Sequence, residues 1–229
     1  MARGEARLTR TIRTILLGVA LSIPTLATAA PGAAPPAESS AAVPAVVKKV
    51  EAKYAGVKGM KARFTQTVRN PAYGDEVQKG EVTLARPAKM HWNFSGDGKQ
   101  FVTDGKTMWI YNPGHKQVIK YADVSAQAGS AQSLLVSLDR IGELFTVTER
   151  PDDAGHTLQL VPRAGDAQYK NVVLHLTPEL TVEKVVITDN FDTVTELVFH
   201  DITLDPKVPD DLFVFRVPKG VEVIDAGSP

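Results

Sequence analysis

An arginine stands among apolar residues where two predicted strands meet at a corner. In residues 81–94, EVTLARPAKMHWNF, Arg86 shares its parity with an apolar set that consists of Val82, Leu84, Met90, Trp92 and Phe94. Side chains at every second strand position lie on one face of a sheet, so we expect Arg86 to lie in line with an apolar surface. A guanidinium that leaves water needs hydrogen-bond acceptors, and their identity decides what the residue does.

Three environments would satisfy Arg86. The first is a salt bridge, for which the candidates are Glu76, Glu81 and Asp123. The second is water, if the corner at Pro87 turns the side chain outward. The third is a set of backbone carbonyls on a covering helix, which the arginine would hold in place as a latch. A hydrogen bond to a charged group contributes roughly 1.5–3 kcal/mol, which suits a lid that has to open.

Residues that could catalyse a reaction are sparse. The chain has no cysteine and no G-x-S-x-G motif, and none of its five histidines has a second ligand placed as in a metal site. The stretch DGKT at 104–107 lacks the earlier glycine of a phosphate-binding loop and leads into a predicted strand. The sequence therefore predicts a protein that is not an enzyme and has neither a metal nor a cofactor.

Apolar residues are plentiful instead. The stretch TMWIY at 107–111 is apolar on both faces, with Met108 and Ile110 on one face and Trp109 and Tyr111 on the other. A strand with two apolar faces must be covered on both sides. We expect one face to pack under a helix at 44–55 and the other to line an apolar cavity, and the sequence leaves open which face does which.

The expected cavity has a wall of strand residues and a cover of helix residues. The predicted wall consists of Phe64, Val82, Leu84, Met90, Trp92, Phe94, Met108 and Ile110. The cover comes from residues 123–144, where helical spacing aligns Leu134, Leu135, Leu138 and Ile141. A helix inside a run of strands must cover something, and we place it over the inside or the mouth of the sheet.

The remaining elements are short strands joined by tight turns. One strand follows the corner at Pro87, and two flank the hairpin signal Asp104-Gly105. The others are predicted at 62–68, 77–85, 117–121, 144–149, 157–161, 171–177, 182–188, 193–203 and 212–217. Eleven or twelve antiparallel strands with few helices are typical of a sandwich or a barrel-like sheet.

The N-terminus has the pattern of an export signal. Residues 1–29 contain four arginines, a short apolar core and a final Ala-x-Ala, as in a cleaved signal peptide. Residues 30–43 are rich in alanine and proline and are expected to form a flexible tether before a domain at 44–229. Without the first 29 residues, 22 basic and 25 acidic residues remain, a balance that does not predict nucleic-acid binding.

Four segments resemble the LolA family of periplasmic outer-membrane lipoprotein carriers. They are FTQ at 64–66, RPAKMHWNF at 86–94, VTDGKTMWIYNP at 102–113 and LFVFRVPKGVEVID at 212–225. Their order and spacing match over about residues 45–225. Two features depart from the family pattern: the alanine- and proline-rich stretch at 30–42 is unusually long, and residues 123–132 hold more alanine and serine than large apolar residues. A milder change is Thr103, which stands where serine is expected.

The resemblance implies a fold, a function and a set of partners. The fold would be mainly β, an unclosed antiparallel half-barrel of about eleven strands with a helical lid over an apolar cavity. Such a protein works in the periplasm of a Gram-negative bacterium as a monomer. It receives acylated lipoproteins from an inner-membrane ABC-type exporter and delivers them to an outer-membrane receptor. The Arg-Pro of the second motif implies that Arg86 is the lid latch, with Met90 and Trp92 in the cavity.

Two other functions fit the same fold. One is a carrier of another lipid or a glycolipid. The other is a regulatory protein that senses lipoproteins, although known sensors of this fold have a second domain, for which the chain has no room. Both share the apolar cavity and differ in its occupant.

Overall fold

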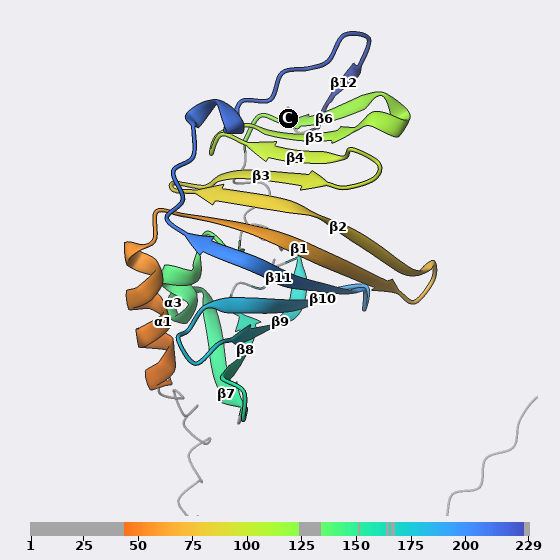
Figure 1. The fold of residues 1–229 in the computed structure, drawn as a ribbon. Helices are drawn as coiled ribbons and strands as arrows, with labels where there is room; N and C mark the ends of the chain where they lie inside the picture. The colour runs from red at the N-terminus through yellow and green to blue at the C-terminus, as the bar shows by residue number, and fades with distance from the viewer. Residues whose placement is uncertain (1–43, 124–133, 151, 164, 166–167, 227–229) are drawn as a thin grey trace, which may run out of the picture. The chain divides into compact units, whose positions relative to one another are not determined.

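One open β-sheet makes up most of the structure. The computed structural model describes residues 44–123, 134–150, 152–163, 165 and 168–226, all within the unit Ala41–Pro229 (Figure 1). Twelve strands lie in the order β12-β6-β5-β4-β3-β2-β1-β11-β10-β9-β8-β7. Strands β12 and β7 are at opposite edges and do not pair, so the sheet is not closed. The prediction of a mainly β, unclosed sheet is confirmed.

The strands follow one another along the chain with short turns between most of them. Their bounds are β1 Gly59–Asn70, β2 Gly74–Ala85, β3 Lys89–Phe94, β4 Gln100–Thr103, β5 Met108–Asn112, β6 Gln117–Tyr121, β7 Phe145–Arg150, β8 His156–Pro162, β9 Tyr169–Leu176, β10 Val182–Asp189, β11 Val194–Leu204 and β12 Glu222–Asp225. All pairings are antiparallel except that of β12 with β6, which is parallel. Figure 1 shows the strand direction turning strongly between β3 and β8, as the twist of large sheets requires.

The helical elements within the described residues are few and short. They are α1 Ala45–Gly56, η1 Pro113–His115, η3 Leu138–Arg140, α3 Ile141–Leu144 and η4 Asp210–Phe213. The expected helix at 44–55 is therefore present as α1. No helix among the described residues is long and apolar enough to cross a membrane.

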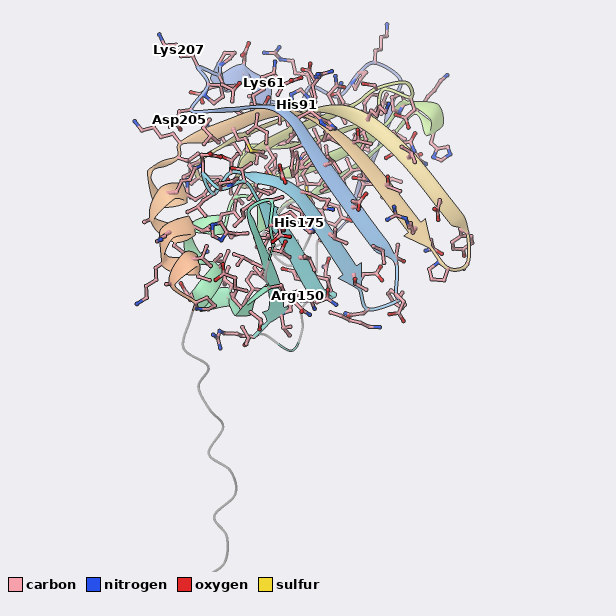
Figure 2. The ribbon with its side chains drawn as sticks, turned by 60° about the horizontal axis from the view of Figure 1, so that its bottom comes forward. Lys61, His91, Arg150, His175, Asp205 and Lys207 are labelled. Carbon is pink, nitrogen blue, oxygen red and sulfur yellow. The ribbon has the colours of Figure 1, made fainter. Side chains whose placement is uncertain are left out.

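The two faces of the sheet are covered differently. We call the face that bears Phe64 and Trp92 the inner face, and the face that bears Lys61 and His91 the outer face (Figure 2 labels the latter two). Helix α1 packs on the inner face through a buried stripe of Val46, Val47, Val50 and Tyr54. Fully burying one such aliphatic side chain stabilises the fold by roughly 1.5–3 kcal/mol. Burial of this stripe explains how α1, which has only 12 residues, is held on the sheet.

Residues 134–144, which we call the covering segment, differ from the predicted helix. Beyond Leu134 the chain turns, forms η3 and then the short α3, with backbone bonds from Ser137 N to Leu134 O and from Arg140 N to Ser137 O. These i→i+3 bonds interrupt a regular α-helix. The four apolar residues still reach one core, because tertiary packing rather than helical spacing brings them there. The part of the predicted helix at 124–133 lies outside the described residues.

The predicted strand at 212–217 is wrong. Residues 205–221, which we call the C-terminal segment, contain η4 and otherwise no regular structure, and the last strand is β12 at Glu222–Asp225. The alternation in LFVFRV reflects packing, since Phe213 and Phe215 both contact other residues. They do so without pairing in the sheet, so alternation alone misidentified the segment as a strand.

The predicted signal peptide at 1–29 and the tether at 30–43 lie outside the described residues, and both stay predictions. The expected domain at 44–229 starts one residue before α1.

Candidate functional site

Arg86 joins the end of β2 to two helical elements. Its Nε donates to the carbonyl of Val57 at 2.9 Å and its Nη2 to the carbonyl of Tyr54 at 2.9 Å. Its Nη1 lies 2.8 Å from Oδ2 of Asp139 in η3. One guanidinium therefore holds the C-terminal end of α1 and the covering segment to the sheet.

The electrostatics of this contact are favourable at each partner. The last carbonyls of a helix have no partner within the helix and carry a partial negative charge, which a cation stabilises. The hydrogen bond from Arg86 holds the pKa of the Asp139 carboxyl below its usual range. Both side chains are only partly exposed, 34% for Arg86 and 20% for Asp139, so water screens this pair less than a surface pair.

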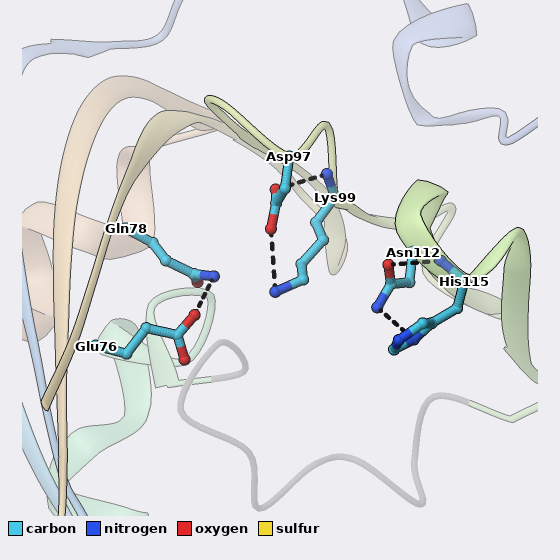
Figure 3. Close-up of polar contacts among 6 residues, drawn as sticks. All are labelled: Glu76, Gln78, Asp97, Lys99, Asn112 and His115. Atoms are coloured by element: carbon cyan, nitrogen blue, oxygen red, sulfur yellow. Dashed lines mark hydrogen bonds and ion pairs between the residues drawn. The ribbon is translucent and has the colours of Figure 1, made fainter. Parts of the chain in front are cut away.

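The observed partners decide between the three environments expected for Arg86. The side chain does not turn to water; it meets helix carbonyls and a carboxylate together. That carboxylate is Asp139, which the sequence did not single out. Glu81 pairs instead with Lys61 at 3.6 Å, and Glu76 accepts a hydrogen bond from Gln78 (Figure 3). The other polar contacts in Figure 3, within Asp97–Lys99 and Asn112–His115, are local turn contacts.

A second contact ties the covering segment to α1. Oε1 of Glu51 accepts a hydrogen bond of 2.8 Å from the backbone N–H of Gly142, at the start of α3. Figure 1 shows α1 and α3 side by side at one end of the sheet. The first N–H groups of a helix have no partner within it, so the Glu51 carboxylate supplies one.

Most of the predicted cavity residues come together. Nine of the twelve are buried in one cluster, namely Phe64, Val82, Leu84, Met90, Trp92, Leu134, Leu135, Leu138 and Ile141. Phe94 is partly buried against that cluster. The ring of Phe64 meets those of Trp92 and Phe94 edge to face, with centroids 5.0 and 5.2 Å apart. Such aromatic pairs add stability beyond the area they bury.

The strand register determines which side chains of β5 lie on the inner face of the sheet. Ile110 pairs with Phe101, which pairs with Trp92, so Ile110 and Met108 share the inner face. Met108 is buried and Ile110 is partly exposed, and neither belongs to the main cluster. The outward rings of Trp109 and Tyr111 lie 6.3 and 5.7 Å from the ring of Phe215. The outer face of β5 is thus covered by the C-terminal segment, whereas the sequence assigned one face to the helix at 44–55.

A small apolar cavity lies beside the Arg86 contact. Its volume is about 30 Å³, and it lies between α1, the first two strands and the covering segment. Its lining consists of Tyr54, Val57, Gly59, Met60, Leu84, Ala85, Arg86, Leu135, Val136, Leu138 and Val182. Such a space has room for roughly two water molecules. Side chains therefore fill most of the space between α1, the first two strands and the covering segment.

Several residues of this cavity were missed from the sequence. Tyr54 belongs to the helical stripe of α1, so its position was visible in the periodicity, but its hydroxyl contact was not. That hydroxyl accepts a hydrogen bond of 3.0 Å from the N–H of Val182, which ties α1 to β10. No local pattern connects residues 128 positions apart. In the described ranges, no three histidine, aspartate or glutamate side chains gather in a group that could hold a metal ion.

The comparison with known proteins identifies the family. The family model for "Outer membrane lipoprotein carrier protein LolA" matches residues 55–216. The chain belongs to the LolA family. An outer-membrane lipoprotein carrier protein from Chromobacterium violaceum is 31% identical over 202 residues, which cover 87% of this chain and 95% of that protein. A second such protein, from Methylobacillus flagellatus, is 30% identical over 183 residues, which cover 78% of this chain and 88% of that protein.

Solved structures give a weaker match. A LolA superfamily protein from Nitrosomonas europaea matches with a TM-score of 0.46 and 13% sequence identity, covering 74% of this chain and 96% of that chain. The LolA-family match begins at Ala55, in the last turn of α1, so it includes Arg86 and Asp139 but not most of α1.

Proposed function

We propose that this LolA-family protein is a periplasmic chaperone that binds the acyl chains of lipoproteins. The chains would lie between the inner face of the sheet and the covering segment, and Arg86 would act as the latch of that lid. The observation that carries the proposal is the Arg86 contact, because it fastens both helical covers to the sheet through one side chain.

The wall has the chemistry of an acyl-binding site. The residues at its centre are apolar, and Met90 brings a flexible side chain that adapts to ligands of varied shape. Trp92 is 1% exposed, so its ring is shielded from solvent in the closed state. Ligand sites of this kind are mostly apolar with few polar groups.

The energetics favour a latch that cargo can open. Each buried CH₂ contributes about 0.8 kcal/mol, so a chain of ~16 carbons offers on the order of 13 kcal/mol before the costs of binding. Three charged hydrogen bonds contribute roughly 5–9 kcal/mol at most. Burial of an acyl chain therefore outweighs the latch, provided that a partner lifts the chain out of the membrane.

The energy for loading and unloading would come from partner proteins. The sequence holds no phosphate-binding loop. An inner-membrane ABC-type exporter would load the carrier, and an outer-membrane receptor with higher affinity for the cargo would unload it. The carrier itself needs no catalysis, and it acts as a monomer.

Co-purification tests the carrier function. The full chain is expressed in a periplasm together with an acylated lipoprotein, in the wild-type form, as Trp92→Asp in the wall, and as the matched control Val77→Asp. Val77 is 60% exposed on β2, so the same substitution there leaves the wall intact. We expect the lipoprotein to co-purify with the wild type and the control but not with Trp92→Asp, provided that circular dichroism shows all three folded. Equal recovery with all three, or with none, would contradict the proposal, and mass spectrometry of extracted lipid would show whether a different lipid is carried.

A further inference from the structure

A groove runs between the outer face of the sheet and the C-terminal segment, on the side away from the proposed acyl site. Its volume is about 450 Å³, within the range of small-molecule sites. The sheet contributes His91, Gln100, Val102 and Tyr111, and the segment contributes Pro209, Asp211, Leu212, Val214, Phe215, Arg216 and Pro218. Figure 1 shows this segment leading from β11 to β12 at the far edge of the sheet.

The floor of the groove holds a polar group without a partner. Nε2 of His91 is buried and has no hydrogen-bond partner in the described part of the chain. Burial lowers the pKa of His91, so its ring is neutral at neutral pH and offers one donor and one acceptor nitrogen. The Gln100 amide, which also lines the groove, adds a donor and an acceptor. A buried polar group of this kind needs a partner, because leaving it unpaired costs free energy.

The walls of the groove are apolar and aromatic. The Phe215 ring lies 5.7 Å from that of Tyr111, and both line the space. Leu212 and Val214 extend the apolar surface along the segment. A ligand must therefore bring an apolar part as well as groups that hydrogen-bond to the floor.

Two opposite charges border the groove. Asp211 and Arg216 are both exposed, and no ion pair to either exists within the ranges that the structure describes. A simple anion would meet Asp211 and a simple cation would meet Arg216, so neither matches the site. A ligand that carries both charges matches both residues.

We propose that this groove binds a short peptide with free ends. The peptide carboxylate would pair with Arg216 and its ammonium group with Asp211. Its amide groups would supply the partner that Nε2 of His91 lacks and would hydrogen-bond to the Gln100 amide, and an apolar side chain would pack against Phe215. The site is independent of the acyl site, since Arg86 and Trp92 take no part in it.

Peptides with blocked ends test the charge assignments one at a time. The probe is the tripeptide Ala-Leu-Ala, titrated into the full chain by calorimetry with free ends, with an acetylated N-terminus, and with an amidated C-terminus. We expect each block to weaken binding about tenfold, the loss that corresponds to 1.4 kcal/mol. In Arg216→Gln, amidation should cost nothing further; in Asp211→Asn, acetylation should cost nothing further.

Controls separate this site from the rest of the molecule. Lys219→Gln changes a neighbouring exposed charge outside the groove lining, and Arg86→Leu changes the proposed latch; both should bind the free tripeptide like the wild type. Asp211 and Arg216 are exposed, so their variants are expected to fold. Absence of binding at millimolar peptide, equal binding of all three peptide forms, or equal losses in Lys219→Gln would each overturn the proposal. A failed carrier assay would not, because that assay reports on the other face.

Discussion

Nη1 of Arg86 lies 2.8 Å from Oδ2 of Asp139, and these two residues join parts of the chain that are 53 positions apart. The same guanidinium donates to two carbonyls at the end of α1. Three elements therefore meet at one side chain: the sheet, α1 and the covering segment. A residue with a single hydrogen bond could hold one of these covers, whereas the five N–H donors of the arginine fork hold both.

Replacing Arg86 by leucine should release the covering segment. Loss of the three charged hydrogen bonds, each worth roughly 1.5–3 kcal/mol, would raise the open population by at least ten- to a hundredfold. Hydrogen exchange of the amides of residues 134–144 measures this opening. If cargo is bound, the variant should retain it, because nothing favours closure on release. The matched control is Arg63→Leu, which removes an exposed salt bridge to Asp201 on the outer face. Normal exchange in residues 134–144 and normal transfer to a receptor would both contradict the latch role.

The Asp139 contact should make stability depend on pH at the acidic end. Its pKa is lowered in the folded protein by the hydrogen bond from Arg86, so the folded state binds fewer protons than the unfolded state. The stabilisation is therefore present above the ordinary carboxyl pKa of about 3.9 and is lost as pH falls through the lower folded value. Unfolding in urea between pH 7 and pH 3 tests this, with Asp139→Asn as the comparison. The difference in unfolding free energy between wild type and variant should be constant near neutrality and shrink below about pH 4. A constant difference over the whole range would show that Asp139 does not act through its charge.

The sheet was predictable from the sequence because its strands are local patterns. Period-two alternation and the turn at Asp104-Gly105 placed strands on either side, and β4 and β5 are found there. The parity of residues 81–94 also placed Val82, Met90 and Trp92 on one face, as the register shows. These features depend only on neighbours along the chain.

The partners of the key residues were not predictable in the same way. Asp139 was missed because its pairing with Arg86 depends on how the covering segment breaks into η3 and α3, which the regular spacing of its leucines concealed. The C-terminal segment was misread as a strand because Phe213 and Phe215 alternate for a different reason, packing on the outer face. Both errors come from tertiary contacts that override a local pattern.

Gly80 should tolerate no side chain. A Cβ there would lie 2.1 Å from the carbonyl oxygen of Asn93 and 2.9 Å from the Phe64 ring, so the strands or the ring would have to shift. We expect Gly80→Ala to lower the free energy of unfolding by roughly 1–3 kcal/mol, the usual cost of overpacking. Urea unfolding measures it. The control is Gly56→Ala at the end of α1, where a Cβ meets nothing within 4 Å. That change should be neutral or stabilise by about 0.5–1 kcal/mol, since alanine favours helix. A loss of stability at Gly56 equal to that at Gly80 would show that the close approach at Gly80 is not the cause.

Because of His91, the free energy of unfolding should decrease as the pH falls below neutrality. Burial lowers its pKa in the folded state, so the unfolded state binds the proton more readily. Stability is then highest above the ordinary histidine pKa of about 6.5, falls as the pH drops through that value, and levels off below the lower folded pKa. His175 adds to the same trend, because burial lowers its pKa as well. Unfolding free energies measured from pH 8 to pH 5 should therefore fall in the wild type and fall less in His91→Gln, with a remaining slope from His175. If His91→Gln keeps the full wild-type slope, His91 does not contribute to the pH dependence.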